Sequence, residues 1–202
     1  MGLLIVIVLI VGVFCGIYID NSVISNITIL TDPLLKLILF FAGLSIGSGG
    51  DIREHVQNNG IDLIMVPLLC IIGTLVGAVI AGLITGYRPF ESMAVGSGLG
   101  WYSLAYVIAE KYDAALAALS FLTSIFREIL AIVTIPYVAK HIGYLEAIVP
   151  GGATTMDTTL PPISQNTDAA TTITAFFSAA MLTFAVPVLI EFFMSLQYKG
   201  AL

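Results

Sequence analysis

Charge is the scarcest component of this sequence. Only 10% of its 202 residues are charged, whereas about a quarter are charged in an ordinary soluble domain. Lys and Arg together number 7, so no basic surface could neutralise the phosphates of a nucleic acid. Disordered chains combine high charge with low hydrophobicity, but here 58% of the residues are hydrophobic and the mean hydropathy is +1.05. These figures exclude most soluble classes and nucleic-acid partners, and they indicate a protein embedded in the lipid bilayer.

Cysteine and histidine are almost absent as well. The 2 cysteines, Cys15 and Cys70, lie in apolar runs and are predicted to be small buried residues that form no disulfide or metal site. His55 and His141 lie in polar flanks away from any cysteine cluster. The sequence also lacks the nucleophile-elbow motif of a Ser–His–Asp hydrolase. We therefore predict no metal, no cofactor and no enzymatic activity.

Long apolar runs predict an all-α fold. A helix needs roughly 20 mostly apolar residues to cross a bilayer, and the apolar segments here cover 3–19, 33–47, 63–85, 92–110, 114–138 and 169–194. We expect one transmembrane domain over 1–202, a polytopic helix bundle with no extramembrane domain, in the cytoplasmic membrane. The few basic residues are spread almost evenly over the loops, so the orientation stays open.

The segment 92–110 is interrupted by glycine. Gly96, Gly98 and Gly100 stand just before Trp101 and Tyr102 in GSGLGWYSL. Glycine destabilises a helix interior, so we expect a broken helix here. A glycine cluster alone is weak support, because glycine is common in membrane helices.

A second interruption lies in PGGATTMDTTLPP. The Pro-Gly-Gly at 150–152 cannot sustain a helix, and Pro161-Pro162 is expected to end any short helix that follows. Two interpretations stay open: a surface loop with Asp157 as a capping residue, or a re-entrant hairpin that places Asp157 at membrane depth. Irregular backbone is tolerated at that depth only where it lines a cavity or is buried in protein. The polar stripe of Thr167, Thr171, Thr174 and Ser178 on the last helix could line the same cavity.

Arg127 and Glu128 lie in the middle of the apolar segment 114–138, in SIFREILAIV. Ionisable groups at membrane depth cost several kcal/mol and are functional candidates. Adjacent helical residues point in different directions, so these two side chains do not face each other. Arg127 could instead pair with a carboxylate elsewhere in an internal salt bridge, and both interpretations stay open.

Three strings, GSGLGWYSL, SIFREILAIV and PGGATTMDTTLP, occur in this order and spacing and resemble the bacterial lysine exporter family LysO over residues 1 to 196. The resemblance implies export of L-lysine and of analogues such as thialysine. It also implies that intramembrane acidic residues, here Glu128 and Asp157, are important for activity. Many members of the family are longer chains with additional helices before the matched region.

The resemblance therefore raises the possibility of a partner. In some organisms the family looks split, so a separate small membrane protein could supply the missing N-terminal helices. Small residues four apart, at 12 and 16, 73 and 77, and 82 and 86, also let helices approach closely. They pack within one chain or meet another subunit, such as the second copy in a homodimer.

Lysine carries two ammonium groups and one carboxylate, which fits the polar groups of the two interruptions. Glu128 and Asp157 would receive the cationic ends, and a carboxylate that exchanges a proton for an ammonium would couple export to proton entry. A half-helix N-terminus near Gly151 or near Trp101 would hold the substrate carboxylate. The alternatives are a cation/proton antiporter and a scaffold subunit that transports nothing. The predicted substrate-binding residues are Glu128, Asp157, Arg127, Gly151, Gly152, Thr154, Thr155, Gly98, Trp101 and Tyr102.

Overall fold

A computed structural model describes residues 60–198 together with the isolated helical positions Val11, Phe14, Cys15, Leu37, Phe40 and Leu44. The helices predicted over 3–19 and 33–47 lie almost wholly outside the described residues. Over the described part, every regular element is a helix, which confirms the predicted all-α fold.

Three of these helices are long and apolar enough to cross a membrane: α4 (Gly60–Thr85), α7 (Ala114–His141) and α9 (Ala169–Gln197). They confirm the spans predicted over 63–85, 114–138 and 169–194, and each extends past at least one predicted end by about one turn. Aspartates start two of them, because a side-chain carboxylate satisfies the free N–H groups of a first turn. Asp113 accepts from the N–H groups of Ala115 and Leu116 at 2.8 and 2.9 Å. Asp168 accepts from Thr171 N at 2.7 Å.

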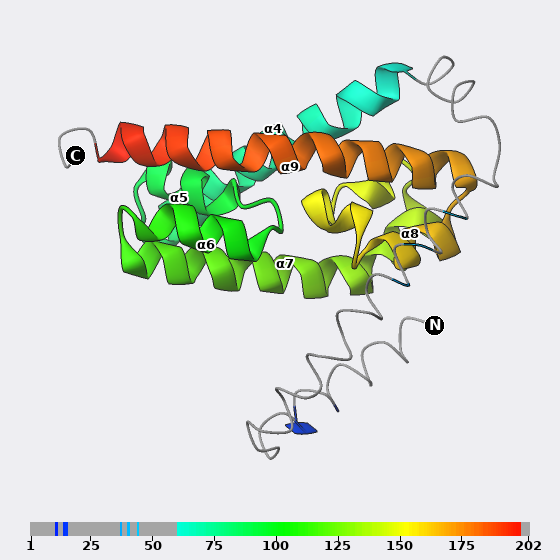
Figure 1. The fold of residues 1–202 in the computed structure, drawn as a ribbon, viewed down its shortest axis with the longest axis horizontal. Helices are drawn as coiled ribbons and strands as arrows, with labels where there is room; N and C mark the ends of the chain where they lie inside the picture. Colours follow the sequence, from blue (N-terminus) through cyan, green and yellow to red (C-terminus); the bar gives the residue numbers. More distant parts are fainter. Residues whose placement is uncertain are drawn as a thin grey trace.

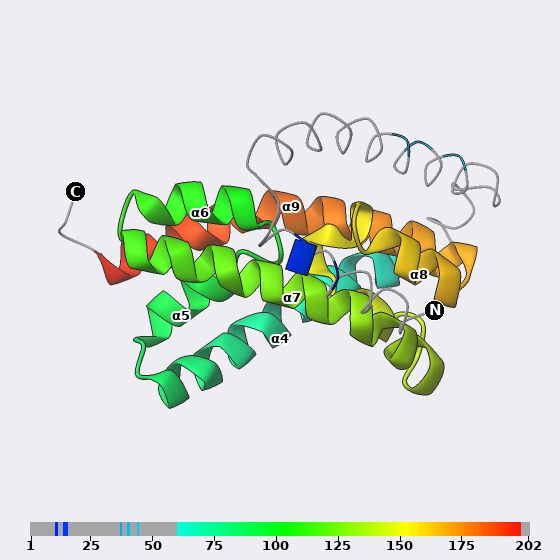
Figure 2. The ribbon, with the colours of Figure 1, turned by 90° about the horizontal axis from the view of Figure 1, so that it is seen from below.

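Two helical hairpins lie between α7 and α9 (Figure 1). The first hairpin, residues 89–110, consists of α5 (Pro89–Gly96) and α6 (Tyr102–Glu110). The second hairpin, residues 146–166, consists of η1 (Glu146–Ile148), η2 (Gly152–Met156) and α8 (Leu160–Asn166). They enter the bundle from opposite ends, in the view of Figure 1 and in the rotated view of Figure 2.

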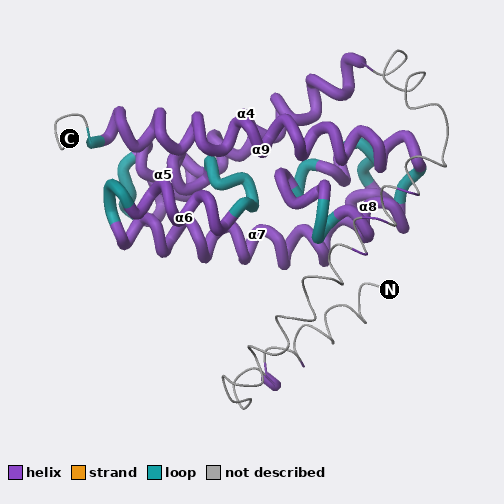
Figure 3. The backbone as a smooth tube through the Cα atoms, in the orientation of Figure 1, coloured by secondary structure: helices purple, strands orange, loops and turns teal. Residues whose placement is uncertain are grey.

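The tips of the two hairpins meet near the middle of the bundle, where Figure 3 shows the loop segments between the short helices. Ala153 N donates to the carbonyl oxygen of Leu99 at 2.9 Å. The backbone is left-handed on both sides of this bond, with φ of 49° at Leu99, 101° at Gly100 and 61° at Gly152. Both predicted interruptions are therefore real breaks, and each supplies one tip.

The prediction for Pro161-Pro162 was wrong. Leu160, Pro161 and Pro162 form the first turn of α8, which then continues to Asn166. A proline is acceptable in the first turn, because its missing N–H would have had no helical partner there. The proline pair therefore begins a short helix.

Apolar packing holds the hairpins against the long helices. One buried cluster includes Leu182, Val186 and Ile190 of α9, and a second includes Ile135 of α7. Large apolar side chains on the outer faces of α4, α7 and α9 are exposed, as lipid contact requires. Cys70 is buried as predicted, but Cys15 is exposed, and both are free thiols.

Replacing Gly152 by Ala tests the contact between the hairpin tips. A Cβ atom there would overlap with the carbonyl oxygen of Leu99, and φ is positive. We expect the free energy of unfolding to fall by about 2 kcal/mol or more, measured as a lower Tm of the purified protein. Gly77→Ala is the matched control, because the space around its Cβ position is empty within 4 Å. Equal Tm values for the two variants would contradict the tip contact.

Candidate functional site

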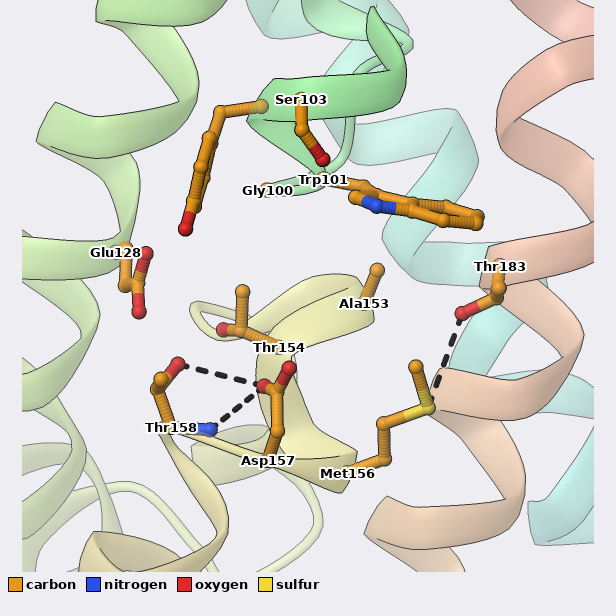
Figure 4. A pocket seen from close by; sticks show the side chains of 11 residues that line it. Gly100, Trp101, Ser103, Glu128, Ala153, Thr154, Met156, Asp157, Thr158 and Thr183 are labelled. Carbon is orange, nitrogen blue, oxygen red and sulfur yellow. Dashed lines mark hydrogen bonds between the residues drawn. The ribbon is translucent and has the colours of Figure 1, made fainter. Parts of the chain in front are cut away.

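A cavity of about 150 Å³ lies where the hairpin tips approach α7 and α9. One water needs only roughly 10–15 Å³ of such space, so the cavity has room for a small organic molecule. Figure 4 shows side chains from four elements converging on it. Its lining residues are Gly100, Trp101, Tyr102, Ser103, Glu128, Ala153, Thr154, Met156, Asp157, Thr158 and Thr183.

Two carboxylates stand on one side of this cavity. Glu128 extends from the middle of α7, and Asp157 lies at the break between η2 and α8. Thr158 N donates to Asp157 Oδ1 at 2.6 Å, and the Thr158 hydroxyl approaches the same oxygen at 3.4 Å. Asp157 therefore belongs to a break that lines a cavity, which favours the re-entrant interpretation over the surface loop.

Arg127 points away from the cavity, although it precedes Glu128 directly. Its Nε donates to Pro150 O at 3.0 Å, and its Nη2 donates to Val149 O at 3.1 Å. The guanidinium also donates to the Thr74 hydroxyl at 3.2 Å and approaches Cys70 Sγ at 3.4 Å. None of its partners among the described residues is a carboxylate, so the expected internal salt bridge is absent from that part of the chain. Arg127 instead joins α7 to α4 and to the backbone that precedes η2.

Four other predicted site residues support the backbone and do not line the cavity. Gly98 allows close packing against Ser124, and an added Cβ would lie 2.9 Å from that hydroxyl. Gly151 and Gly152 give the second hairpin its turn. The Thr155 hydroxyl donates to the carbonyl oxygens of Gly152 at 2.8 Å and Ala175 at 3.0 Å, which docks the hairpin on α9.

The other predicted residues line the cavity. Thr154 contributes to the wall, but its hydroxyl donates to Gly151 O at 2.9 Å. Trp101 is the residue before α6 and Tyr102 is its first residue. The Tyr102 ring packs edge-to-face on Phe121 at 5.5 Å between centroids. The first turn of α6 therefore reaches the cavity at the positive end of the helix dipole. Tyr102 N donates to Gly100 O at 3.0 Å, whereas the N–H groups of Ser103 and Leu104 have no backbone partner among the described residues.

Sequence reasoning did not select several of the lining residues, namely Gly100, Ser103, Ala153, Met156, Thr158 and Thr183. Thr158 and Ser103 adjoin selected residues, so proximity in sequence could have found them. Thr183 lies outside the polar stripe that was expected to line the cavity. That stripe is elsewhere, because Thr171, Thr174 and Ser178 are buried on a face of α9 outside the lining.

Broken helices that meet around a polar cavity, between helices long enough to span a bilayer, are typical of secondary transporters. Over the described residues, the fold is that of a polytopic membrane helix bundle. The chain belongs to the lysine exporter LysO family, whose family model matches residues 6–194.

Two curated proteins illustrate the relationship. The chain is 29% identical to "Lysine exporter LysO" of Escherichia coli strain K12 over 160 residues, which are 79% of this chain and 53% of that protein. It is also 29% identical to a "Putative lysine exporter" of Haemophilus influenzae, over 80% of this chain and 83% of that protein. The chain thus spans about half the length of the Escherichia coli relative. No solved structure matches it significantly.

Proposed function

We propose that this protein exports L-lysine, and analogues such as thialysine, across the cytoplasmic membrane in exchange for protons. The names of the two relatives suggest the substrate class. The observation that carries the proposal is the pair Glu128 and Asp157 in one cavity at mid-bundle. The nearest basic side chain in sequence, Arg127, is committed to carbonyl oxygens on another face of α7.

The described residues that line the cavity include two acids and no basic side chain, which suits an amino acid with two ammonium groups. A buried carboxylate is costly unless it is paired or protonated. An incoming ammonium and a proton would therefore compete for the same carboxylate oxygens. By alternating access, such a site accepts lysine from one side of the membrane and protons from the other. The proton gradient then drives the export of lysine.

The carboxylate of lysine needs a separate partner, because the two acids would repel it. The first turn of α6 offers the backbone N–H groups of Ser103 and Leu104 and the positive end of a helix dipole near Trp101. Lysine would thus bind with its charges matched at both ends of the cavity.

Counterflow in proteoliposomes tests this function. Vesicles loaded with unlabelled lysine are expected to accumulate external radiolabelled lysine transiently, together with a lysine-dependent change in internal pH. Norleucine, which has the same chain length without the ε-ammonium, is expected not to compete. A sodium-dependent pH change without lysine counterflow would contradict the proposal and indicate a cation/proton antiporter. No flux of either kind would indicate a scaffold subunit.

A further inference from the structure

The chain contains two units of the same design. Each unit is a hairpin of short helices followed, after an aspartate cap, by a long helix: residues 89–110 with α7, and residues 146–166 with α9. Asp113 caps the first long helix and Asp168 caps the second, with carboxylate-to-N distances between 2.7 and 2.9 Å. Each hairpin also contains left-handed backbone at its tip.

The two units run in opposite directions. Figure 1 shows α7 and α9 antiparallel on either side of the hairpins, and each hairpin begins at the end of the bundle where its own long helix starts. The packing is reciprocal, because α6 contacts both α7 and α9, and α8 contacts both as well. An inverted repeat has this arrangement, and transporters with inverted repeats bind substrate at the interface of the two units.

The repeat relates two residues of the cavity. Glu128 lies 15 residues after Asp113, and Thr183 lies 15 residues after Asp168. Both line the cavity, and Figure 4 shows them on opposite walls, one on α7 and the other on α9. The wall around Glu128 holds the second carboxylate. The wall around Thr183 holds Ala153 and Met156, with Trp101 beside it.

The hydroxyl of Thr183 has a defined hydrogen-bonding role. It donates its proton to Ala179 O at 2.8 Å, while the contact with Met156 Sδ is longer, at 3.9 Å. A hydroxyl has one donor proton and two acceptor lone pairs. With the proton committed, the Thr183 oxygen can only accept, so a suitable ligand group there is a donor such as an ammonium.

We propose that Thr183 is the counterpart of Glu128 in an inverted repeat, and that it binds the α-ammonium of the substrate at the end of the cavity opposite the carboxylates. The ε-ammonium then lies at Glu128 and Asp157, and the carboxylate lies at the first turn of α6 beside Trp101. The orientation of lysine rests on the proposed function, whereas the repeat does not.

Counterflow with Thr183→Val tests the contact, because valine keeps the volume and removes the oxygen. The KM for lysine is expected to rise about tenfold, because one hydrogen bond to a charged group is lost. Thr183→Ser, which keeps the hydroxyl, is expected to have the wild-type KM. The inhibition constant of 6-aminohexanoate, which is lysine without its α-amino group, is expected to stay unchanged. The matched control is Thr134→Val, because Thr134 makes the same back-bond, to Leu130 O at 2.8 Å, outside the cavity.

The outcomes below distinguish the role of Thr183, the proposed function and the repeat. Two results would overturn the role of Thr183 while leaving lysine transport intact. In the first, Thr183→Val weakens the binding of lysine and of 6-aminohexanoate equally. In the second, the KM for lysine stays at its wild-type value. Absence of lysine counterflow in the wild type would overturn the proposed function instead.

The repeat is tested without substrate by four single-cysteine variants in a Cys15→Ser, Cys70→Ser background. Arg88→Cys and Lys111→Cys flank the first hairpin, and Tyr144→Cys and Gln165→Cys flank the second. A membrane-impermeant maleimide is expected to label the first pair from one side and the second pair from the other, and any other pattern would overturn the repeat.

Discussion

Replacing Glu128 by Gln is expected to lower lysine counterflow at least about a hundredfold, because a charged hydrogen bond to the substrate ammonium is worth roughly 3 kcal/mol. Asp157→Asn is expected to have a similar effect, since both carboxylates line one cavity. The neutral amides keep the size of the side chains and cannot exchange a proton for a cation. Initial rates in proteoliposomes, normalised to the amount of inserted protein, measure the effect.

Glu110→Gln is the matched control for this loss. Glu110 is exposed at the end of α6, where its carboxylate accepts a hydrogen bond from Tyr106 at 3.0 Å. We expect the rate of lysine counterflow in Glu110→Gln to equal that of the wild type. Wild-type counterflow in both Glu128→Gln and Asp157→Asn would remove these acids from the mechanism.

Arg127→Ala is expected to have the largest effect on stability. The guanidinium donates to two backbone carbonyl oxygens and to the Thr74 hydroxyl, and its removal leaves these acceptors without their partner. A loss of about 3 kcal/mol or more in the free energy of unfolding follows. Transport is expected to fall with it, because the second hairpin loses its anchor to α7 and α4. Thermal unfolding of the purified variant measures the first effect.

Lys140→Ala controls for the loss of a positive charge from the same helix. Lys140 is exposed in the last turn of α7, so its removal is expected to change the Tm little. Normal Tm and expression of Arg127→Ala, combined with an altered substrate preference, would show instead that Arg127 binds substrate directly.

Much of this fold follows from composition and local rules. Apolar length predicted the three spans of the described region. Glycine and proline predicted both breaks, because those residues act on the backbone locally. The role of Pro161 was harder to predict, since proline can either end a helix or begin one.

The site was harder to predict, because it depends on directions that sequence spacing does not define. Arg127 and Glu128 are adjacent, yet one donates to carbonyl oxygens and the other lines the cavity. Thr183 has no motif around it, and only the folded arrangement of two opposed hairpins brings it opposite Glu128. Gly151 and Gly152 were selected because a half-helix N-terminus after them could hold the substrate carboxylate, but in the structure they shape the turn of the second hairpin.

Lysine is proposed to bind in the cavity between the hairpin tips. Substrate protection of Thr158→Cys tests it most directly, because Thr158 is an exposed residue beside Asp157 that lines this cavity. In the Cys15→Ser, Cys70→Ser background, saturating lysine is expected to slow alkylation of Thr158→Cys severalfold, while norleucine does not and a cysteine at Thr134 stays unaffected. An alkylation rate of Thr158→Cys that is the same with and without lysine, in protein that still exchanges lysine, would contradict the account.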